Sequence, residues 1–247
     1  MTDNDLINIS KALKLNKSIT DLNLADADFT DEGLKELGNS LSKNSTLKKL
    51  FLDYSLKESE GLRHIADAFK TGECAIEHLS LNKCNLKDSG AKMIFESQIS
   101  RKKIRTLSLN ENEIKGELEL DKFFQNNKDY FFGGIEKLWL ERNASISKKF
   151  VNTLTQVGFH QKSKETDELN QGLKLLSLSR CTEIGQDFAS HIIESLGSLG
   201  SIELLLDDCE LDDKIVESIC DAIVHPKASF TLSLENNKIT EDGLKTL

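Results

Sequence analysis

The sequence predicts an α/β protein: a right-handed solenoid, or horseshoe, of about eight repeats, with a parallel sheet on its concave side and helices on its convex side. In eight short segments, two leucines or equivalent residues stand two positions apart. A small or amide residue follows three positions later, and its copies are 28, 29, 28, 31, 38, 28 and 28 positions apart. Such a steady period is typical of stacked supersecondary units and not of one globular core. These eight residues are Ala27, Ser55, Cys84, Asn112, Asn143, Cys181, Cys209 and Asn237.

Each repeat is expected to contain a short strand with one buried face. In residues 76–86, Leu79 and Leu81 alternate with polar residues such as His78 and Ser80. Alternation with a period of two indicates a strand, because successive side chains of a strand point to opposite faces.

A helix is expected to follow each strand. Beyond the strand, the apolar spacing becomes helical, as in Leu34, Leu37 and Leu41. The segments 30–33 and 240–243 separate strand from helix, and each places a threonine before two acidic residues. We therefore expect Thr30 and Thr240 to be helix N-caps, with the carboxylates near the positive end of the helix.

The predicted domain organisation has two parts. Residues 1–18 are expected to form a half-repeat capping helix, and residues 19–247 the repeat domain with a polar insertion at about 160–172. The capping helix carries apolar residues at Leu6, Ile9, Leu13 and Leu15. The last repeat stops midway through a helix without a polar cap. Because open solenoid ends invite association, we expect a longer gene product, a partner or self-association through this end.

A strand, a turn and a helix within about 28 residues resemble the ribonuclease-inhibitor type of leucine-rich repeat. Residues 104–114 match its L-x-x-L-x-L-x-x-N/C-x-L motif at every position, from Ile104 through Leu107, Leu109 and Asn112 to Ile114. The resemblance covers about residues 19–247. It implies the horseshoe fold, but it does not imply one activity, because this class of repeat serves many partners.

Composition limits the classes of partner and the compartment. The formal net charge of -9 disfavours nucleic acid and anionic membranes as partners. No stretch approaches about 20 apolar residues, and the first residues lack the apolar region of a secretory signal. Three of the five cysteines occupy the repeating small-residue position, which predicts free thiols in a reducing compartment. We expect a cytoplasmic protein, or a protein of the host cytosol if it is an exported bacterial effector.

The sequence predicts no catalytic residue, metal site or cofactor. No Gly-rich phosphate loop, HExxH or CxxC motif is present. Cys74, His78 and Cys84 form a conceivable zinc site, but a buried repeat thiol beside a strand histidine is the favoured interpretation. One catalytic alternative comes from small-GTPase activators that resemble this repeat type and present an arginine at the strand ends. Arg142 and Arg180 stand just past strands, although no motif of that family is present.

The predicted function is non-catalytic recognition of a protein partner on the concave face. The only tryptophan, Trp139, lies between Leu138 and Leu140, so strand alternation places it on that face. Leu175 and Leu205 are expected on the same wall within about 10 Å, which is the composition of an interface hot spot. An alternative is that Trp139 only covers neighbouring polar side chains. The predicted partner-binding residues are Lys137, Trp139, Glu141, Arg142, Leu175, Arg180, Leu205, Asp207 and Asp208, with Phe51, Asp53 and Tyr54 as a further patch.

Charge is distributed unevenly along the chain. From residue 200 onward there are eleven acidic residues and four lysines, whereas residues 135–180 hold eight basic and five acidic residues. This asymmetry suits a partner with complementary charges, and it equally suits an acidic surface that is simply solvated. Two alternatives to a general recognition module stay open: a small-GTPase activator, and a bacterial effector that binds a host protein.

Overall fold

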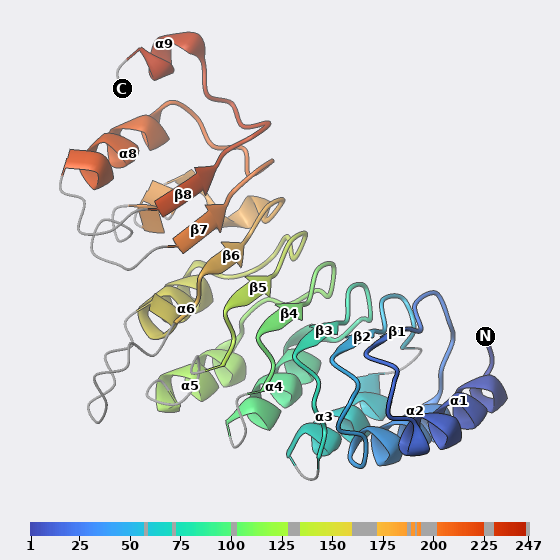
Figure 1. Ribbon diagram of the computed structural model, residues 1–247. Helices are drawn as coiled ribbons and strands as arrows, with labels where there is room; N and C mark the ends of the chain where they lie inside the picture. The colour runs from blue at the N-terminus through green and yellow to red at the C-terminus, as the bar shows by residue number, and fades with distance from the viewer. Residues whose placement is uncertain are drawn as a thin grey trace.

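The computed structural model describes residues 1–56, 59–70, 73–99, 103–127, 134–159, 172–186, 189–190, 192–193, 202–224 and 230–245. Eight parallel strands form one sheet in the order β1 to β8, so each strand pairs with the next one in the sequence. The helices follow the outside of the curve that the strands make (Figure 1). This arrangement confirms the predicted α/β horseshoe.

The strands are short and evenly spaced along the chain. They are β1 (Asp21–Asn23), β2 (Lys49–Phe51), β3 (His78–Ser80), β4 (Thr106–Ser108), β5 (Lys137–Trp139), β6 (Leu175–Ser177), β7 (Ile202–Leu205) and β8 (Phe230–Ser233). The helices are α1 (Asp3–Leu15), α2 (Asp31–Leu41), α3 (Leu62–Lys70), α4 (Lys87–Gln98), α5 (Leu118–Asn126), α6 (Lys148–Phe159), α8 (Lys214–Val224) and α9 (Glu241–Leu244), with 3-10 turns η1 (Ser59–Gly61) and η2 (Thr182–Ile184).

The core is a stack of equivalent apolar residues. The register pairs the leucine in the middle of one strand with the leucine in the middle of the next, as in Leu107, Leu138 and Leu176. All three are fully buried. On the helical side, Phe124 of α5 makes edge-to-face contacts with Phe95 of α4 and Phe150 of α6, at centroid distances of 5.0 and 5.3 Å. Each repeat therefore buries its apolar face against the next one.

The amide residues at the repeating small-residue position join neighbouring repeats. The Asn112 amide nitrogen donates to the carbonyl oxygens of Leu81 and Asn110 at 2.8 and 3.1 Å. The Asn112 side-chain oxygen accepts from the backbone N–H groups of Cys84 and Leu86 at 2.9 and 3.3 Å. One buried side chain thus satisfies four backbone groups that would otherwise lack partners. We call the eight residues at this position the ladder.

Three ladder residues are cysteines, and all three are free buried thiols. The sulfur atoms of Cys84, Cys181 and Cys209 donate to carbonyl oxygens of the preceding repeat, at 3.1, 3.3 and 3.4 Å. Burial raises the pKa of the Cys84 thiol to about 11 and that of Cys181 to about 12. The thiols are therefore neutral donors well above neutral pH.

These raised pKa values predict a loss of stability in alkaline solution. Well below pH 9 the folded and unfolded states both keep the Cys84 proton, because the ordinary pKa of a cysteine thiol is 9.0. Between pH 9 and the folded pKa of about 11, the unfolded state loses the Cys84 proton and the folded state keeps it, so the free energy of unfolding falls as the pH rises. We expect the free energy of unfolding to fall by about 1 kcal/mol per such thiol between about pH 8 and pH 10. Urea unfolding under reducing conditions measures this slope.

The matched control is Cys84→Ser, because Ser55 occupies the same ladder position and donates to the Leu24 carbonyl at 2.6 Å. This variant should lose the share of the alkaline slope that Cys84 contributes. A slope identical to that of the original protein would contradict the assignment of the pKa shift to Cys84.

Both predicted N-caps are confirmed, but the two threonine side chains bond differently. The Thr240 hydroxyl oxygen accepts from the Gly243 N–H at 3.2 Å, so this cap is confirmed. Thr30 stands at the N-cap of α2, as predicted, although its side chain makes no capping bond. Its hydroxyl instead donates to Asp3 at 2.6 Å, and its N–H donates to the same carboxylate at 3.0 Å. The two bonds hold Thr30 toward α1 and tie the first helix to the first complete repeat.

The N-terminal helix packs beside α2. Leu6 and Leu13 are buried and Ile9 is half-buried, whereas Leu15 is 80% exposed and does not cover the repeats. The domain boundary at residues 18 and 19 stays a prediction. The predicted insertion at 160–172 lies outside the described residues, except for Gly172.

Candidate functional site

The concave face consists of rows of equivalent side chains. Because the strands pair in phase, one residue from each repeat lies beside its counterparts in the neighbouring repeats, about 4.8 Å apart along the sheet. Ser108, Trp139, Ser177, Leu205 and Ser233 are consecutive members of one such row. The adjacent row contains Thr106, Lys137, Leu175, Glu203 and Thr231.

Trp139, Leu175 and Leu205 form what we call the apolar cluster. Trp139 and Leu205 are half-buried, as expected for the concave face. The expected exposure of Leu175 is wrong, because only 6% of this residue is accessible. The register places Leu175 between Lys137 and Glu203, with Trp139 and Leu205 diagonal to it on the same two strands. What remains available to a partner is therefore Trp139 and Leu205.

Ser177 lies between Trp139 and Leu205 in the same row. It is completely buried although it belongs to the concave side. Its hydroxyl donates to the Glu141 carboxylate at 2.7 Å. The alternative that Trp139 covers a polar neighbour is thus consistent with the structure, and part of its ring is accessible.

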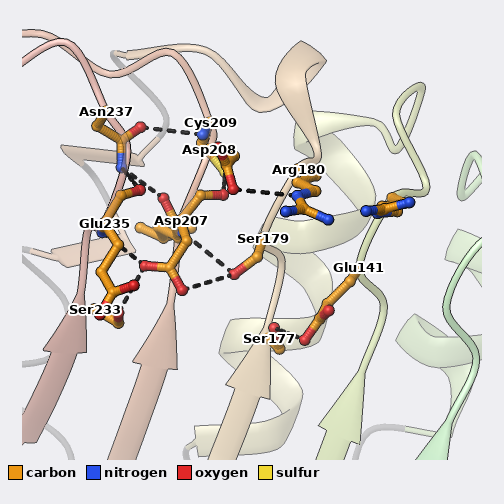
Figure 2. A network of polar contacts seen from close by, with 12 residues as sticks. Glu141, Ser177, Ser179, Arg180, Asp207, Asp208, Cys209, Ser233, Glu235 and Asn237 are labelled. Carbon is orange, nitrogen blue, oxygen red and sulfur yellow. Dashed lines mark hydrogen bonds and ion pairs between the residues drawn. The ribbon is translucent and has the colours of Figure 1, made fainter.

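The predicted binding residues Asp53, Glu141 and Asp207 make hydrogen bonds within the protein. They stand two residues past the ends of β2, β5 and β7, and each accepts from the next repeat. Asp53 accepts from the Ser80 hydroxyl at 2.6 Å and the Asn82 N–H at 2.7 Å. Asp207 accepts from the Ser233 hydroxyl at 2.6 Å and the Glu235 N–H at 2.7 Å (Figure 2). These carboxylates hold neighbouring repeats together.

The residue just before each ladder position has a positive φ. In all eight repeats this angle lies between 52° and 62°, a conformation that residues other than glycine rarely adopt. Backbone bonds to the next repeat hold it, such as Arg142 N–H to the Ser179 carbonyl at 3.0 Å. These residues, which we call the turn row, are Asp26, Tyr54, Lys83, Glu111, Arg142, Arg180, Asp208 and Asn236.

Neighbouring members of the turn row attract one another. The Lys83 ammonium lies 4.8 Å from the centre of the Tyr54 ring, a cation–π contact. Arg142 pairs with Glu111 at 3.5 Å, and Arg180 pairs with Asp208 at 3.1 Å (Figure 2). Both arginines of the GTPase-activator alternative are therefore exposed and already paired with carboxylates. That alternative stays a prediction.

A row of alternating charges lies just before the strands. Lys48 pairs with Glu77 at 2.6 Å, and Glu136 lies between Arg105 at 2.5 Å and Lys174 at 2.9 Å. Hydrogen bonds from Lys48 and Lys174 lower the pKa values of Glu77 and Glu136, respectively. This row was not predicted from the sequence. Its signal was a charge of alternating sign at the position before the strand in five consecutive repeats, from Lys48 to Lys174.

The predicted patch of Phe51, Asp53 and Tyr54 lies apart from the apolar cluster. Phe51 in β2 is half-buried and Tyr54 is 47% exposed, so both have accessible ring surface. Strands β3 and β4 lie between β2 and β5, which places Phe51 about 14 Å from Trp139 along the sheet. The two aromatic patches are therefore separate surfaces.

The side chains of the described part of the chain form no metal-binding group. Within it, no three His, Cys, Asp or Glu side chains are grouped as a metal site requires. Of the helices described, none combines the length and the apolar character needed to cross a membrane.

Comparisons with known proteins agree with this geometry. A family model described as leucine-rich repeat matches residues 15–38 and 74–95. NACHT, LRR and PYD domains-containing protein 9 from Bos taurus is 29% identical over 217 residues, which are 86% of this chain and 20% of that protein. Ribonuclease inhibitor from Sus scrofa is 24% identical over 229 residues, which are 91% of this chain and 47% of that protein. The chain spans less than half the length of each of these two relatives.

Among solved structures, the leiomodin-1 actin-binding site 2 is similar to this chain with a TM-score of 0.51. It is 17% identical, and the match covers 62% of this chain and 85% of that one. At this identity the likeness concerns the fold alone.

Proposed function

We propose that this chain, a leucine-rich repeat protein of the ribonuclease-inhibitor type, is a non-catalytic module that recognises a protein partner on its concave face. The proposal depends mainly on one observation: Trp139 and Leu205 expose apolar surface on the same row of that face. Partly exposed tryptophan with aliphatic neighbours is the composition of interface hot spots.

The names of similar proteins agree with this proposal. One relative is named as an inhibitor of ribonuclease, and one solved structure is titled as an actin-binding site. Both names describe action on another protein. The identity of the partner, a cytoplasmic location and self-association stay predictions.

The test compares how well the original protein and the Trp139→Ala variant capture the partner. The tagged protein and its variants are incubated with a lysate of the source cells, and bound proteins are identified by mass spectrometry. Calorimetry with the purified partner then measures the affinity. We expect Trp139→Ala to weaken binding by about 2 kcal/mol, or roughly thirtyfold, because the anchor is lost.

Lys11→Ala on the exposed surface of α1 is the matched control and should leave the affinity within about twofold. Equal affinities of Trp139→Ala and Lys11→Ala would contradict the proposed surface. If a small GTPase is captured and its GTP hydrolysis is accelerated in an Arg142- or Arg180-dependent way, the module is an activator instead.

A further inference from the structure

We propose that the face formed by the apolar cluster and strands β7 and β8 binds a basic segment of the partner. In that segment, an apolar side chain contacts Trp139 and Leu205, and flanking Lys or Arg residues pair with Glu203 and Glu235. This inference rests on the proposed function and specifies the chemistry of the partner.

The concave side of β7 and of the turn after it alternates charge with apolar surface. Glu203, Leu205 and Asp207 are two residues apart, so all three belong to the concave side. Leu205 therefore stands between two carboxylates at intervals of about 6.6 Å. The register of β7 and β8 places Glu235 beside Asp207 in the next repeat. A segment with an apolar residue between two basic ones is therefore complementary in charge and polarity to Leu205 flanked by Glu203 and Glu235.

Two carboxylates on this face lack a counter-charge among the described residues. Asp208 is paired with Arg180, and Asp207 accepts hydrogen bonds from Ser233 and Glu235, as Figure 2 shows. In the part of the chain that the structure describes, no Lys, Arg or His nitrogen lies within 4.0 Å of the Glu203 or Glu235 carboxylates.

The carboxylates of the charged row before the strands, unlike Glu203 and Glu235, have basic partners among the described residues. There, Glu77 and Glu136 each contact at least one basic side chain. At the concave positions of β7 and β8 and of the turns after them, the sequence has four acidic residues and no basic one: Glu203, Asp207, Asp208 and Glu235. Among the described residues, only Asp208 of these four pairs with a basic side chain, that of Arg180. The remaining negative charge favours a basic partner and raises its association rate.

The protein contains its own reporter for this test, because Trp139 is the only tryptophan in the chain. It is two strands from Leu205, with Ser177 between them. The probes are tryptophan-free synthetic peptides with a central leucine flanked on both sides by lysines. Matched peptides replace the lysines with glutamates, or the leucine with serine. Emission of Trp139 is recorded during each titration.

We expect the lysine-flanked leucine peptide to change the Trp139 emission saturably. Raising the salt concentration from about 50 to 300 mM should weaken this binding at least threefold, because the added ions screen the attraction between the lysines and the carboxylates. The glutamate-flanked peptide should produce no change, and the serine peptide should bind about tenfold more weakly.

The decisive variant is Glu203→Gln with Glu235→Gln, for which we expect about tenfold weaker binding of the lysine peptide. Its matched control is Glu217→Gln with Asp221→Asn, which changes the charge equally on the exposed surface of α8. Circular dichroism checks that both variants are folded. Equal affinities of the two variants, tighter binding of the glutamate peptide, or an unchanged emission up to millimolar peptide would each overturn the inference.

The two proposals fail separately. If the captured partner is lost with Trp139→Ala but retained by Glu203→Gln with Glu235→Gln, recognition on the concave face stands and the basic segment is wrong. If the lysine peptide binds as expected but Trp139→Ala retains the captured partner, the surface has the inferred chemistry and the partner uses another face.

Discussion

Leu138→Ala should lower the free energy of unfolding by about 2–5 kcal/mol, the usual cost of removing a buried leucine and leaving a cavity. Leu138 is fully buried, and the register places it between Leu107 and Leu176, which are fully buried too. The lost contacts therefore lie on both sides of the repeat. Urea unfolding followed by circular dichroism measures the loss.

The neighbouring variant Trp139→Ala should cost only about 1 kcal/mol of stability, because this side chain is half-buried. Leu138→Met, which keeps the side-chain volume, should cost less than about 1.5 kcal/mol. Equal losses in Leu138→Ala and Trp139→Ala would mean that the assignment of buried and concave positions in β5 is wrong.

Asn112→Ala should lower the free energy of unfolding by about 3–5 kcal/mol. The substitution removes all four hydrogen bonds between the Asn112 side chain and the backbone. Alanine replaces none of them, and each buried group left without a partner costs roughly 1–3 kcal/mol, partly relieved by local adjustment. The same urea experiment measures the change.

Asn112→Asp separates hydrogen bonding from volume. It has nearly the same shape, but it turns a carboxylate oxygen toward the carbonyls of Leu81 and Asn110, so it should be at least as damaging at neutral pH. Asn8→Ala, on the exposed surface of α1, should stay within about 0.5 kcal/mol. A comparably small effect of Asn112→Ala would contradict the role given to the ladder.

The features that depend on one residue type at one position were predictable from the sequence. Leu79 and Leu107 had to be buried, because a period of two allows a strand only one apolar face. Cys84 and Asn112 share a position that requires a small residue or an amide donating to a backbone carbonyl, and both do so. The fold follows from these repeated requirements.

The features that depend on neighbouring strands were not predictable in this way. Leu175 alternates as an exposed residue would, yet it is buried, and it lies in the middle of the sheet between β5 and β7. Asp53 and Asp207 look like surface charges until the register brings a serine hydroxyl from the next repeat to each. The positive φ of Tyr54 has no sequence signal, because the turn is held by backbone bonds and not by a glycine.

The ladder also gives the solenoid a direction. Ser55, Cys84, Asn112 and Cys181 all donate to a carbonyl of the repeat that precedes them. Each interface therefore places a donor of the later repeat against a carbonyl of the earlier one. Loss of either repeat leaves a buried group of the other without its partner. Melting that begins at one repeat should thus destabilise its neighbours on both sides, so the repeats should unfold as a coupled array and not one by one.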